Sequence, residues 1–325
     1  MRETDVLITV ADVEAEAERI AGHVVRTPTV PSPGLSALLG VPTTVKLELL
    51  QRTGSFKARG ATAKLLTLTR AERAAGVVTV SGGNHGIALA VMAGMLDVKA
   101  TVVMPRSAPT GARDVAAAAG ASVHIADTMD GAFALVDELR DAGLTLVHPF
   151  DDPTVIAAQG TVGLEFAQDA GDLTDVLVSI GGGALAAGAA TALRARCPGI
   201  RVWGVETEGA RAMSAALEAG GPVPVELSSI VSTLSAPSAS QLTYEHASAL
   251  LTDALTVTDA EAVQGTLDLA DHAKVWAEPA AGCLLPGARQ VLQRVGEDAR
   301  LGLVICGGNA TTADVSAWAE HLGLR

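Results

Sequence analysis

Three short segments combine small residues with a polar or reactive side chain, and a fourth is a run of glycines followed by alanine and leucine. A glycine-rich loop between a strand and a helix offers unpaired N–H groups and the positive end of a helix to a phosphate. Three consecutive glycines, Gly181 to Gly183, therefore predict an anion cradle, and close helix–sheet packing without a ligand is the alternative. The four segments are TGSFKARG at 53–60, SGGNHG at 81–86, GGGAL at 181–185 and CGGN at 306–309.

The triple glycine also admits a second interpretation. Gly181, Gly183 and Ala186 fit the pattern G-x-G-x-x-A. Glu206 ends the next predicted strand about 20 residues on, as a dinucleotide-binding fingerprint requires. A nicotinamide-dependent oxidoreductase is therefore a rival hypothesis. The loop alone does not decide between a nicotinamide cofactor, another phosphate and no ligand.

Lys57 favours a different phosphate-bearing cofactor. The chain has five lysines against 18 arginines, and this lysine lies between Phe56 and a turn rich in glycine and serine. An amine in an apolar pocket loses its proton more readily than one in water and can form a Schiff base. A reactive lysine, a phosphate cradle and a flanking aromatic ring together suit pyridoxal phosphate.

Seven motifs in order along the chain resemble the fold-type II pyridoxal phosphate enzymes, specifically the serine/threonine dehydratase (threonine ammonia-lyase) family. The resemblance runs from about Thr27 to Asn309. The motifs are TGSFKARGA at 53–61, SGGNHG at 81–86, HPFDDPTVIAAQGTVGLE at 148–165, SIGGGALAAG at 179–188, GVET at 204–207, EPAAG at 278–282 and CGGN at 306–309.

The resemblance implies a role for each site residue. Lys57 would hold the cofactor as a Schiff base and later remove the Cα proton of the substrate. Phe56 would pack on the cofactor ring, Asn84 would hydrogen-bond the ring hydroxyl, and Cys306 would face the pyridine nitrogen. The phosphate would be held by backbone N–H groups of Gly181, Gly182, Gly183, Ala184 and Leu185. The substrate carboxylate would be received by the loop of Ser81, Gly82, Gly83, Asn84 and His85.

Three departures from the family pattern sharpen these expectations. Gly82 stands where the racemase branch has a serine that acts as acid and base, so elimination should dominate over racemisation. Ala184 stands where many relatives have a fourth glycine, which backbone binding should tolerate. Ala212 stands where relatives with a divalent metal have an acidic residue, so no such metal is expected. Glu206, with backbone carbonyls, is a candidate site for a monovalent cation.

The elements that must position these residues alternate between short apolar strands and alanine-rich helices. Strands are predicted at 77–80, 100–104, 122–125, 144–148, 176–180, 202–206 and 301–306, and the helix after the first of them at 86–96. This alternation is typical of an α/β fold with parallel-stranded sheets covered by helices on both faces.

The resemblance divides such a fold into two domains. A small domain at 64–148 would carry the Asn84 loop, and a large domain would take residues 1–63 and 149–325. A cleft between them would hold the cofactor. A C-terminal regulatory domain, found in biosynthetic threonine dehydratases, is not expected.

Composition excludes several classes of protein. The net charge of −13 and an aromatic content of 2% argue against a nucleic-acid partner. Val176 to Leu193 forms an uncharged run of 18 residues, but its glycines predict a strand, loop and helix rather than a membrane span. The acidic N-terminus lacks the features of a signal peptide, so a cytoplasmic enzyme is expected. A homodimer is the usual assembly.

The predicted function is pyridoxal phosphate-dependent β-elimination from L-threonine and/or L-serine, giving 2-oxobutyrate or pyruvate and ammonia. Within the same chemistry, the alternatives are dehydration of 3-hydroxyaspartate and β-replacement of the cysteine-synthase kind. Outside it stand the nicotinamide-dependent oxidoreductase and a catalytically silent relative. The 227–244 stretch is a candidate wall of the substrate pocket.

Overall fold

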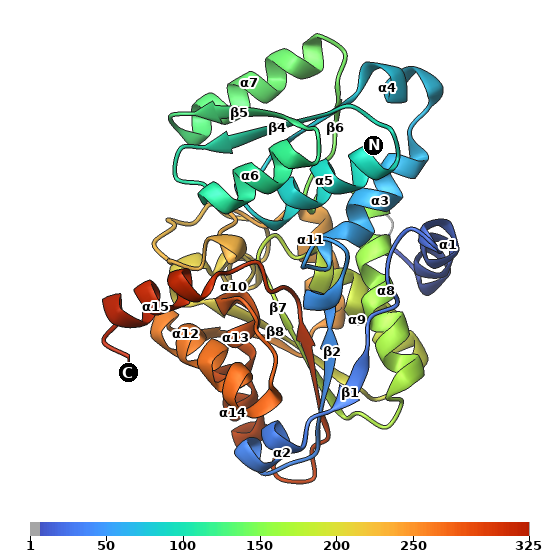
Figure 1. Ribbon diagram of the computed structural model, residues 1–325. Coiled ribbons are helices and arrows are strands. Elements are labelled where there is room, and N and C mark those ends of the chain that lie inside the picture. The colour runs from blue at the N-terminus through green and yellow to red at the C-terminus, as the bar shows by residue number, and fades with distance from the viewer. Residues whose placement is uncertain (1–6, 325) are drawn as a thin grey trace.

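The computed structural model describes residues 7–324, and in this part of the chain the strands form two sheets (Figure 1). The larger sheet has the order β1-β2-β10-β7-β8-β9 and the smaller one the order β5-β4-β3-β6. The strands of the larger sheet are β1 (Thr29–Pro31), β2 (Thr43–Leu47), β7 (Asp175–Ser179), β8 (Arg201–Thr207), β9 (Asp253–Val257) and β10 (Leu301–Ile305). Those of the smaller sheet are β3 (Val77–Val80), β4 (Ala100–Pro105), β5 (Ser122–Ala126) and β6 (Thr145–Leu146).

Nearly all strand pairs are parallel, as the alternation of strands and helices predicts. The exception is the edge strand β1, which pairs antiparallel with β2. A parallel neighbour needs a long crossover, whereas β1 and β2 are separated only by the short helix α2 (Pro33–Leu39). Strand β1, which the sequence did not predict, is therefore an antiparallel edge on an otherwise parallel sheet.

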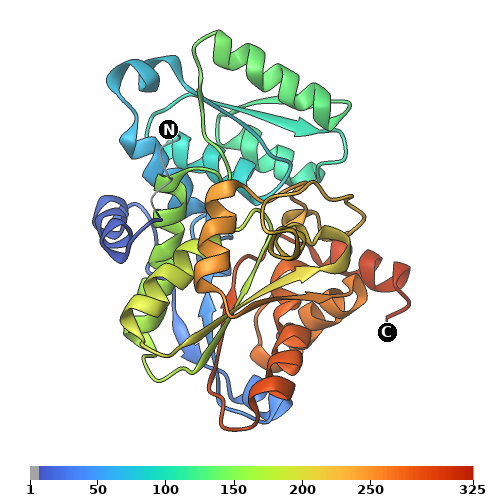
Figure 2. The same ribbon diagram turned by 180° about the vertical axis from the view of Figure 1, so that it is seen from behind.

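Helices cover both faces of each sheet (Figures 1 and 2). In Figure 1, α7 lies above the smaller sheet and α5 and α6 lie below it, while α8 and α9 lie on the opposite side of the larger sheet from α12 to α14. The other helices are α1 (Val10–Ile20), α3 (Lys57–Thr67), α4 (Arg70–Ala75), α5 (Asn84–Met95), α6 (Thr110–Ala118), α7 (Met129–Asp141), α8 (Pro153–Asp169), α9 (Ala184–Arg196), α10 (Ala212–Ala219), α11 (Gln241–Leu250), α12 (Asp259–Asp268), α13 (Pro279–Gly282), α14 (Leu284–Val295) and α15 (Thr312–His321).

Helix α8 is packed tightly between α3 and α9. Glycines permit the close approach: a Cβ on Gly60 of α3 would meet the side chains of Val155 and Gln159 on α8. On the other side of α8, a Cβ on Gly188 of α9 would collide with the Ile156 carbonyl and the Gly160 backbone. The three helices therefore form one layer with little room to slide.

The 18-residue uncharged run is the strand β7, the glycine loop and most of α9, as predicted. No helix among residues 7–324 combines the length and the apolar character that a bilayer crossing requires. All four strands of the smaller sheet lie within the range predicted for the small domain. Helix α3 crosses the predicted boundary at residue 63, and the division into domains stays a prediction.

Candidate active site

Lys57 is the first residue of α3 and is partly buried. Its Nζ donates a hydrogen bond of 2.8 Å to the Pro149 carbonyl and lies 5.0 Å from the centre of the Phe56 ring. Burial lowers the pKa of Lys57 to about 8, and Cys306 opposes the shift. Pro149 belongs to the segment that leads from β6 to α8, and nothing in the sequence indicated that its carbonyl would hold the amine.

Residues 181–185, predicted to hold the phosphate and called the phosphate loop here, connect β7 to α9 and form the start of that helix. Gly183 precedes α9 with φ +95°, and no side chain among the described residues caps this end of the helix. The first N–H groups of α9 are therefore free for a ligand. Ala184 and Leu185, expected at the edge of the loop, lie in the first turn of α9. The Phe150 ring fills the space that a Cβ on Gly182 would occupy, so glycine is required there.

Asn84 and His85 open α5, whereas the sequence predicted a helix beginning at Gly86. Asn84 lies in a chain of side-chain hydrogen bonds. Its Nδ2 donates to Glu278 Oε1 at 2.7 Å, and its Oδ1 accepts from Asn309 Nδ2 at 2.7 Å. The Asn84 amide therefore has a fixed orientation. The family resemblance placed Glu278 near the cofactor ring, with a turn residue as the alternative, and it gave Asn309 no role.

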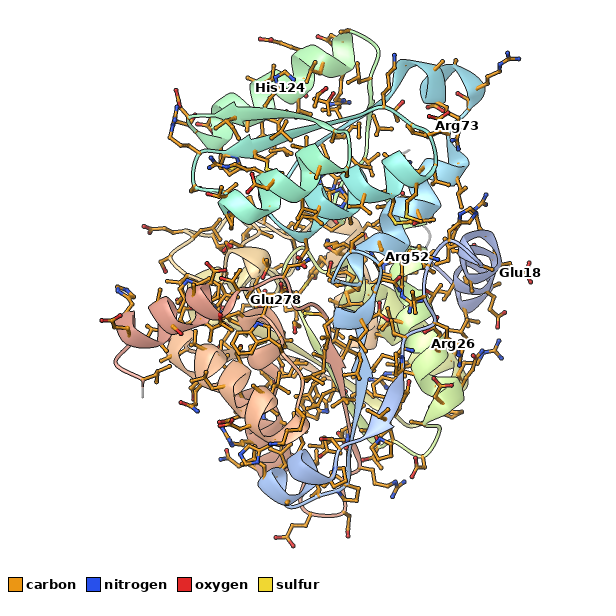
Figure 3. The ribbon with its side chains drawn as sticks, in the orientation of Figure 1. Glu18, Arg26, Arg52, Arg73, His124 and Glu278 are labelled. Atoms are coloured by element: carbon orange, nitrogen blue, oxygen red, sulfur yellow. The ribbon has the colours of Figure 1, made fainter. Side chains whose placement is uncertain are left out.

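Glu278 is buried, at 3% exposure, before α13. Figure 3 places it well inside the outline of the molecule, whereas Glu18 and Arg73 lie at the periphery. Burial raises the pKa of Glu278 to about 7, although the hydrogen bond from Asn84 opposes this. Near neutral pH the carboxyl is therefore present in both protonated and ionised forms.

The Ser81–His85 segment follows β3 at the carboxyl end of the smaller sheet. Gly83 N–H donates to the Ser81 hydroxyl at 3.3 Å. The buried His85 ring contacts the Val147 carbonyl through Nε2 at 3.0 Å, and because a carbonyl only accepts, Nε2 carries the proton. Burial, with a further contribution from Lys57, lowers the pKa of His85 to about 3, so the ring is neutral.

Gly82 has no room for a side chain. A Cβ built on it would lie 2.8 Å from the Ala108 Cβ and 3.3 Å from the Pro105 Cδ. A serine here would require the 105–108 loop to move. Glycine in place of the serine of the racemase branch is therefore consistent with the close packing around residue 82.

Cys306 lies next to Phe56 and Lys57 in the fold, although it is 249 positions after Lys57 in the sequence. Phe56 N–H donates to the Cys306 carbonyl at 3.0 Å, and Ser55 pairs with Gly307 in an isolated antiparallel bridge. The Cys306 thiol is buried and lies 3.9 Å from Ser179 Oγ. Burial, and then Glu278, raise the pKa of this thiol well above its usual range, so it is neutral.

Glu206 lies at the end of β8 and is fully engaged by α10. Its Oε1 accepts from Met213 N–H at 2.8 Å, and its Oε2 accepts from Ser214 N–H at 2.8 Å and from the Ser214 hydroxyl at 2.6 Å. The monovalent cation near Glu206 stays a prediction.

Several buried polar atoms in the candidate site have no hydrogen-bond partner in the described part of the chain. Among residues 7–324, the buried Ser55 Oγ, Glu278 Oε2 and His85 Nδ1 make no hydrogen bond. They accompany an amine of lowered pKa and a loop whose N–H groups suit a phosphate. A planar, phosphate-bearing aldehyde with polar ring substituents fits this combination, so the residues present are compatible with pyridoxal phosphate.

Comparisons with known proteins agree with this chemistry. The family model described as "Pyridoxal-phosphate dependent enzyme" matches residues 20–307. The phenylserine dehydratase of Ralstonia pickettii is 36% identical over 321 residues, which cover 97% of this chain and 98% of that one. The solved threonine deaminase of T.th. has a TM-score of 0.86 at 36% identity, with 93% of this chain and 99% of that one covered.

A third relative is named for racemisation rather than for dehydration or deamination. Maize serine racemase has a TM-score of 0.91 at 28% identity, with 98% of this chain and 99% of that one covered. The family model and the identities over nearly the whole length establish kinship with pyridoxal phosphate enzymes that act on amino acids. The chain belongs to the pyridoxal-phosphate dependent enzymes, within the fold-type II serine and threonine dehydratase family.

Proposed function

We propose that the protein catalyses β-elimination of water from a small hydroxy amino acid, L-threonine and/or L-serine, giving 2-oxobutyrate or pyruvate and ammonia. The observation that carries the proposal is the Lys57 amine. Burial lowers its pKa to about 8, its Nζ bonds to the Pro149 carbonyl, and the next residue, Phe150, packs against Gly182 of the phosphate loop. An amine with this pKa is a competent base at physiological pH.

Each site residue has a proposed task in this reaction. The phosphate loop binds the phosphate of the cofactor through N–H groups of 181–185, and Asn84 presents its clamped amide to the ring. The bound cofactor supplies the electron sink that makes the Cα–H bond of the substrate acidic. Lys57 Nζ removes that proton. The Ser81–His85 segment orients the substrate by its carboxylate.

The buried, neutral Cys306 and the crowded Gly82 favour elimination over other outcomes. If Cys306 faced the pyridine nitrogen, as the resemblance implies, its neutral thiol would give that nitrogen no charged partner, which would weaken the electron sink and favour loss of the β-hydroxyl. The Cα–H and Cβ–O bonds break, water leaves, and the enamine hydrolyses to the 2-oxo acid and ammonia. Racemisation needs an acid on the opposite face of Cα, and Gly82 has no proton to donate.

The substrate is tested with a panel of hydroxy amino acids. The cofactor-loaded enzyme is incubated with L-serine, L-threonine, L-phenylserine and 3-hydroxyaspartate, and 2-oxo acid and ammonia are quantified together. We expect equimolar oxo acid and ammonia from serine or threonine. Turnover of phenylserine alone would instead assign phenylserine dehydration, the activity in the name of the Ralstonia relative.

Racemisation is measured in the same incubations by chiral chromatography. The proposal predicts that D-serine forms far more slowly than pyruvate. D-serine as the main product would instead favour the activity that names the maize relative.

A further inference from the structure

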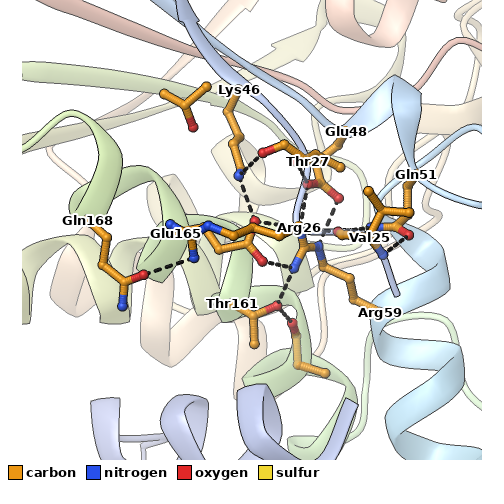
Figure 4. Close-up of polar contacts among 12 residues, drawn as sticks. Val25, Arg26, Thr27, Lys46, Glu48, Gln51, Arg59, Thr161, Glu165 and Gln168 are labelled. Carbon is orange, nitrogen blue, oxygen red and sulfur yellow. Dashed lines mark hydrogen bonds and ion pairs between the residues drawn. The ribbon is translucent and has the colours of Figure 1, made fainter. Parts of the chain in front are cut away.

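Four buried charged side chains lie behind the first turn of α3, and we call them the Arg59 cluster: Arg59, Lys46, Glu48 and Glu165 (Figure 4). Arg59, Lys46 and Glu48 have 0% exposure, and the Glu165 side chain has 12%. Two positive charges balance two negative ones. Burial alone would lower the pKa of Arg59, but Glu48 and Glu165 raise it above its usual range, so the guanidinium stays charged.

Arg59 binds both carboxylates with two hydrogen bonds each. Nε and Nη2 donate to Glu48 at 2.9 and 2.7 Å, and Nη1 and Nη2 donate to Glu165 at 2.7 and 2.9 Å. Nη1 also donates to Thr161 Oγ1 at 3.0 Å. Bidentate pairing on two sides fixes the plane of the guanidinium as well as its position.

The cluster joins α3 to three other elements, the short 3-10 helix η1 (Glu48–Leu50), α8 and β2. Glu48 begins η1, and Thr161 and Glu165 belong to α8. Lys46 of β2 closes the cluster by donating to Glu165 Oε2 at 2.6 Å and to the Thr27 carbonyl at 2.7 Å. Because a buried ion network adds little net stability over well-packed apolar side chains, its main consequence is geometric.

Arg59 and Lys57 share the first turn of α3 but point in different directions. At about 100° per residue, two positions along a helix are about 200° apart. Lys57 Nζ accordingly contacts Pro149 on one side, whereas Arg59 contacts α8 and η1 on the other. No described side chain caps the start of α3, and apart from the Lys57 bond to Pro149 the side-chain hydrogen bonds from this turn to other elements come from Arg59.

Helix α8 connects the Arg59 contacts to the helix that follows the phosphate loop. On one side it accepts the hydrogen bonds of Arg59, and on the other its Gly160 packs against Gly188 of α9. Helix α9 begins directly after Gly183 of the phosphate loop. The separation between the Lys57 amine and the phosphate loop is thus set through α3, α8 and α9.

We propose that Arg59 is a positioning residue for Lys57: by clamping the first turn of α3 to α8, it fixes the Lys57 amine at the distance from the phosphate loop that cofactor attachment requires. The inference rests on the proposed roles of Lys57 and the phosphate loop. It does not depend on which amino acid is the substrate.

The test compares Arg59→Met with a matched control, Arg201→Met, in the full-length protein freed of cofactor. Arg201 pairs with the buried Asp175 at 2.6 Å, at the opposite end of β7 from the phosphate loop. Two ligands are used: pyridoxal phosphate, whose attachment to Lys57 gives a visible absorption band, and pyridoxamine phosphate, which has no aldehyde and therefore reports on non-covalent binding by the phosphate loop and the ring contacts.

We expect Arg59→Met to form the visible band 10- to about 100-fold more slowly than the unaltered protein, because a displacement of about 1 Å has effects of this size. Its affinity for pyridoxamine phosphate should be unchanged. Arg201→Met should match the unaltered protein with both ligands, even where its melting temperature falls as far as that of Arg59→Met.

Two further variants decide the question if Arg59→Met does not fold. Arg59→Lys keeps the charge but loses the bidentate geometry, and Thr161→Val removes one hydrogen bond. Both should slow band formation in the same direction, Thr161→Val less. Wild-type rates in both variants would overturn the proposal. So would equal slowing in Arg59→Met and Arg201→Met, or loss of pyridoxamine phosphate binding in Arg59→Met. Since no amino acid is added, these results are independent of whether serine or threonine is eliminated.

Discussion

The reactivity that we propose for Lys57 follows from its surroundings more than from its residue type. A lysine in water, with a pKa near 10.4, is almost wholly protonated at pH 7.5. Burial beside Phe56 lowers the pKa of Lys57 to about 8, which makes the neutral amine a substantial fraction. The neutral form is the one that attacks an aldehyde and accepts a proton.

This pKa predicts how cofactor capture depends on pH. The rate at which the cofactor-free protein captures pyridoxal phosphate should rise with pH until about 8 and then level off, because Lys57 is then deprotonated. Stopped-flow absorbance measures the rate, with Nα-acetyl-lysine in the same buffers as the control for ionisations of the aldehyde itself. A rate that keeps rising to pH 10, as the control should, would contradict the lowered pKa.

Glu278 gives a second pH-dependent prediction, this time on stability. Its pKa is about 4.3 in an unfolded chain and about 7 when folded, so the folded state binds more protons between these values. The free energy of unfolding should therefore fall as pH rises through this window, by up to about 4 kcal/mol from this group. Glu278→Gln, which still accepts from Asn84, should lack this component.

Urea unfolding of the cofactor-free protein and of Glu278→Gln, at intervals from pH 4.5 to 8, measures the difference directly. As pH rises, the free energy of unfolding of the variant should increase relative to that of the unaltered protein. Parallel stability curves for the two proteins would show that Glu278 does not titrate in this range.

Among the elements of the site, the phosphate loop depends on the left-handed backbone conformation of one residue, Gly183. Gly183 has φ +95°, and a Cβ there would lie 2.8 Å from Met213 Cε and 2.9 Å from Thr243 Cβ. Gly183→Ala should lower the stability by about 1–3 kcal/mol and weaken cofactor binding, because the loop must shift.

Gly220 provides the matched control for that substitution. It has φ +76°, and in the described part of the chain no atom lies within 4 Å of a Cβ placed on it. Gly220→Ala should show the backbone penalty, about 1 kcal/mol, without loss of cofactor affinity. Calorimetric titration with pyridoxal phosphate separates the two effects, and equal affinities in both variants would contradict a special role for Gly183.

The elements that sequence reasoning found are those whose signal is local. The apolar runs at 77–80 and 176–180 gave strands within a residue of their observed bounds, because fully buried parallel strands are continuously apolar. Strand β2 was not predicted. Its sequence, Thr43–Leu47, includes Lys46 at 0% exposure, and the partner that makes this burial possible, Glu165, lies 119 residues away.

For the molecule as a whole, the site is assembled from segments that are distant in the sequence. Asn84 joins Glu278 and Asn309 across 194 and 225 residues. Motif types predicted which segments carry chemistry, since glycine loops and a lone lysine are local features. The contacts of Lys57 with Pro149 and of Phe150 with Gly182 depend on how the two sheets are placed, and no spacing rule in the sequence encodes that.

A cofactor bound between elements of both sheets should stabilise the whole fold. Binding to the folded state alone adds about 2.7 kcal/mol to the free energy of unfolding at a ligand concentration 100 times the Kd. We expect the melting temperature of the protein to rise with pyridoxal phosphate concentration, and to rise much less in Lys57→Ala. Differential scanning calorimetry measures both, and a melting temperature insensitive to the cofactor would contradict a site of this kind.

The central claim, that Lys57 carries the cofactor, is tested most directly by locating the attachment. Borohydride reduction of the cofactor-loaded protein, followed by proteolysis and mass spectrometry, identifies the modified lysine among the five: Lys46, Lys57, Lys64, Lys99 and Lys274. We predict stoichiometric modification of Lys57 and none at buried Lys46 or exposed Lys99. Stoichiometric label on another lysine, with Lys57 unmodified, would contradict the account.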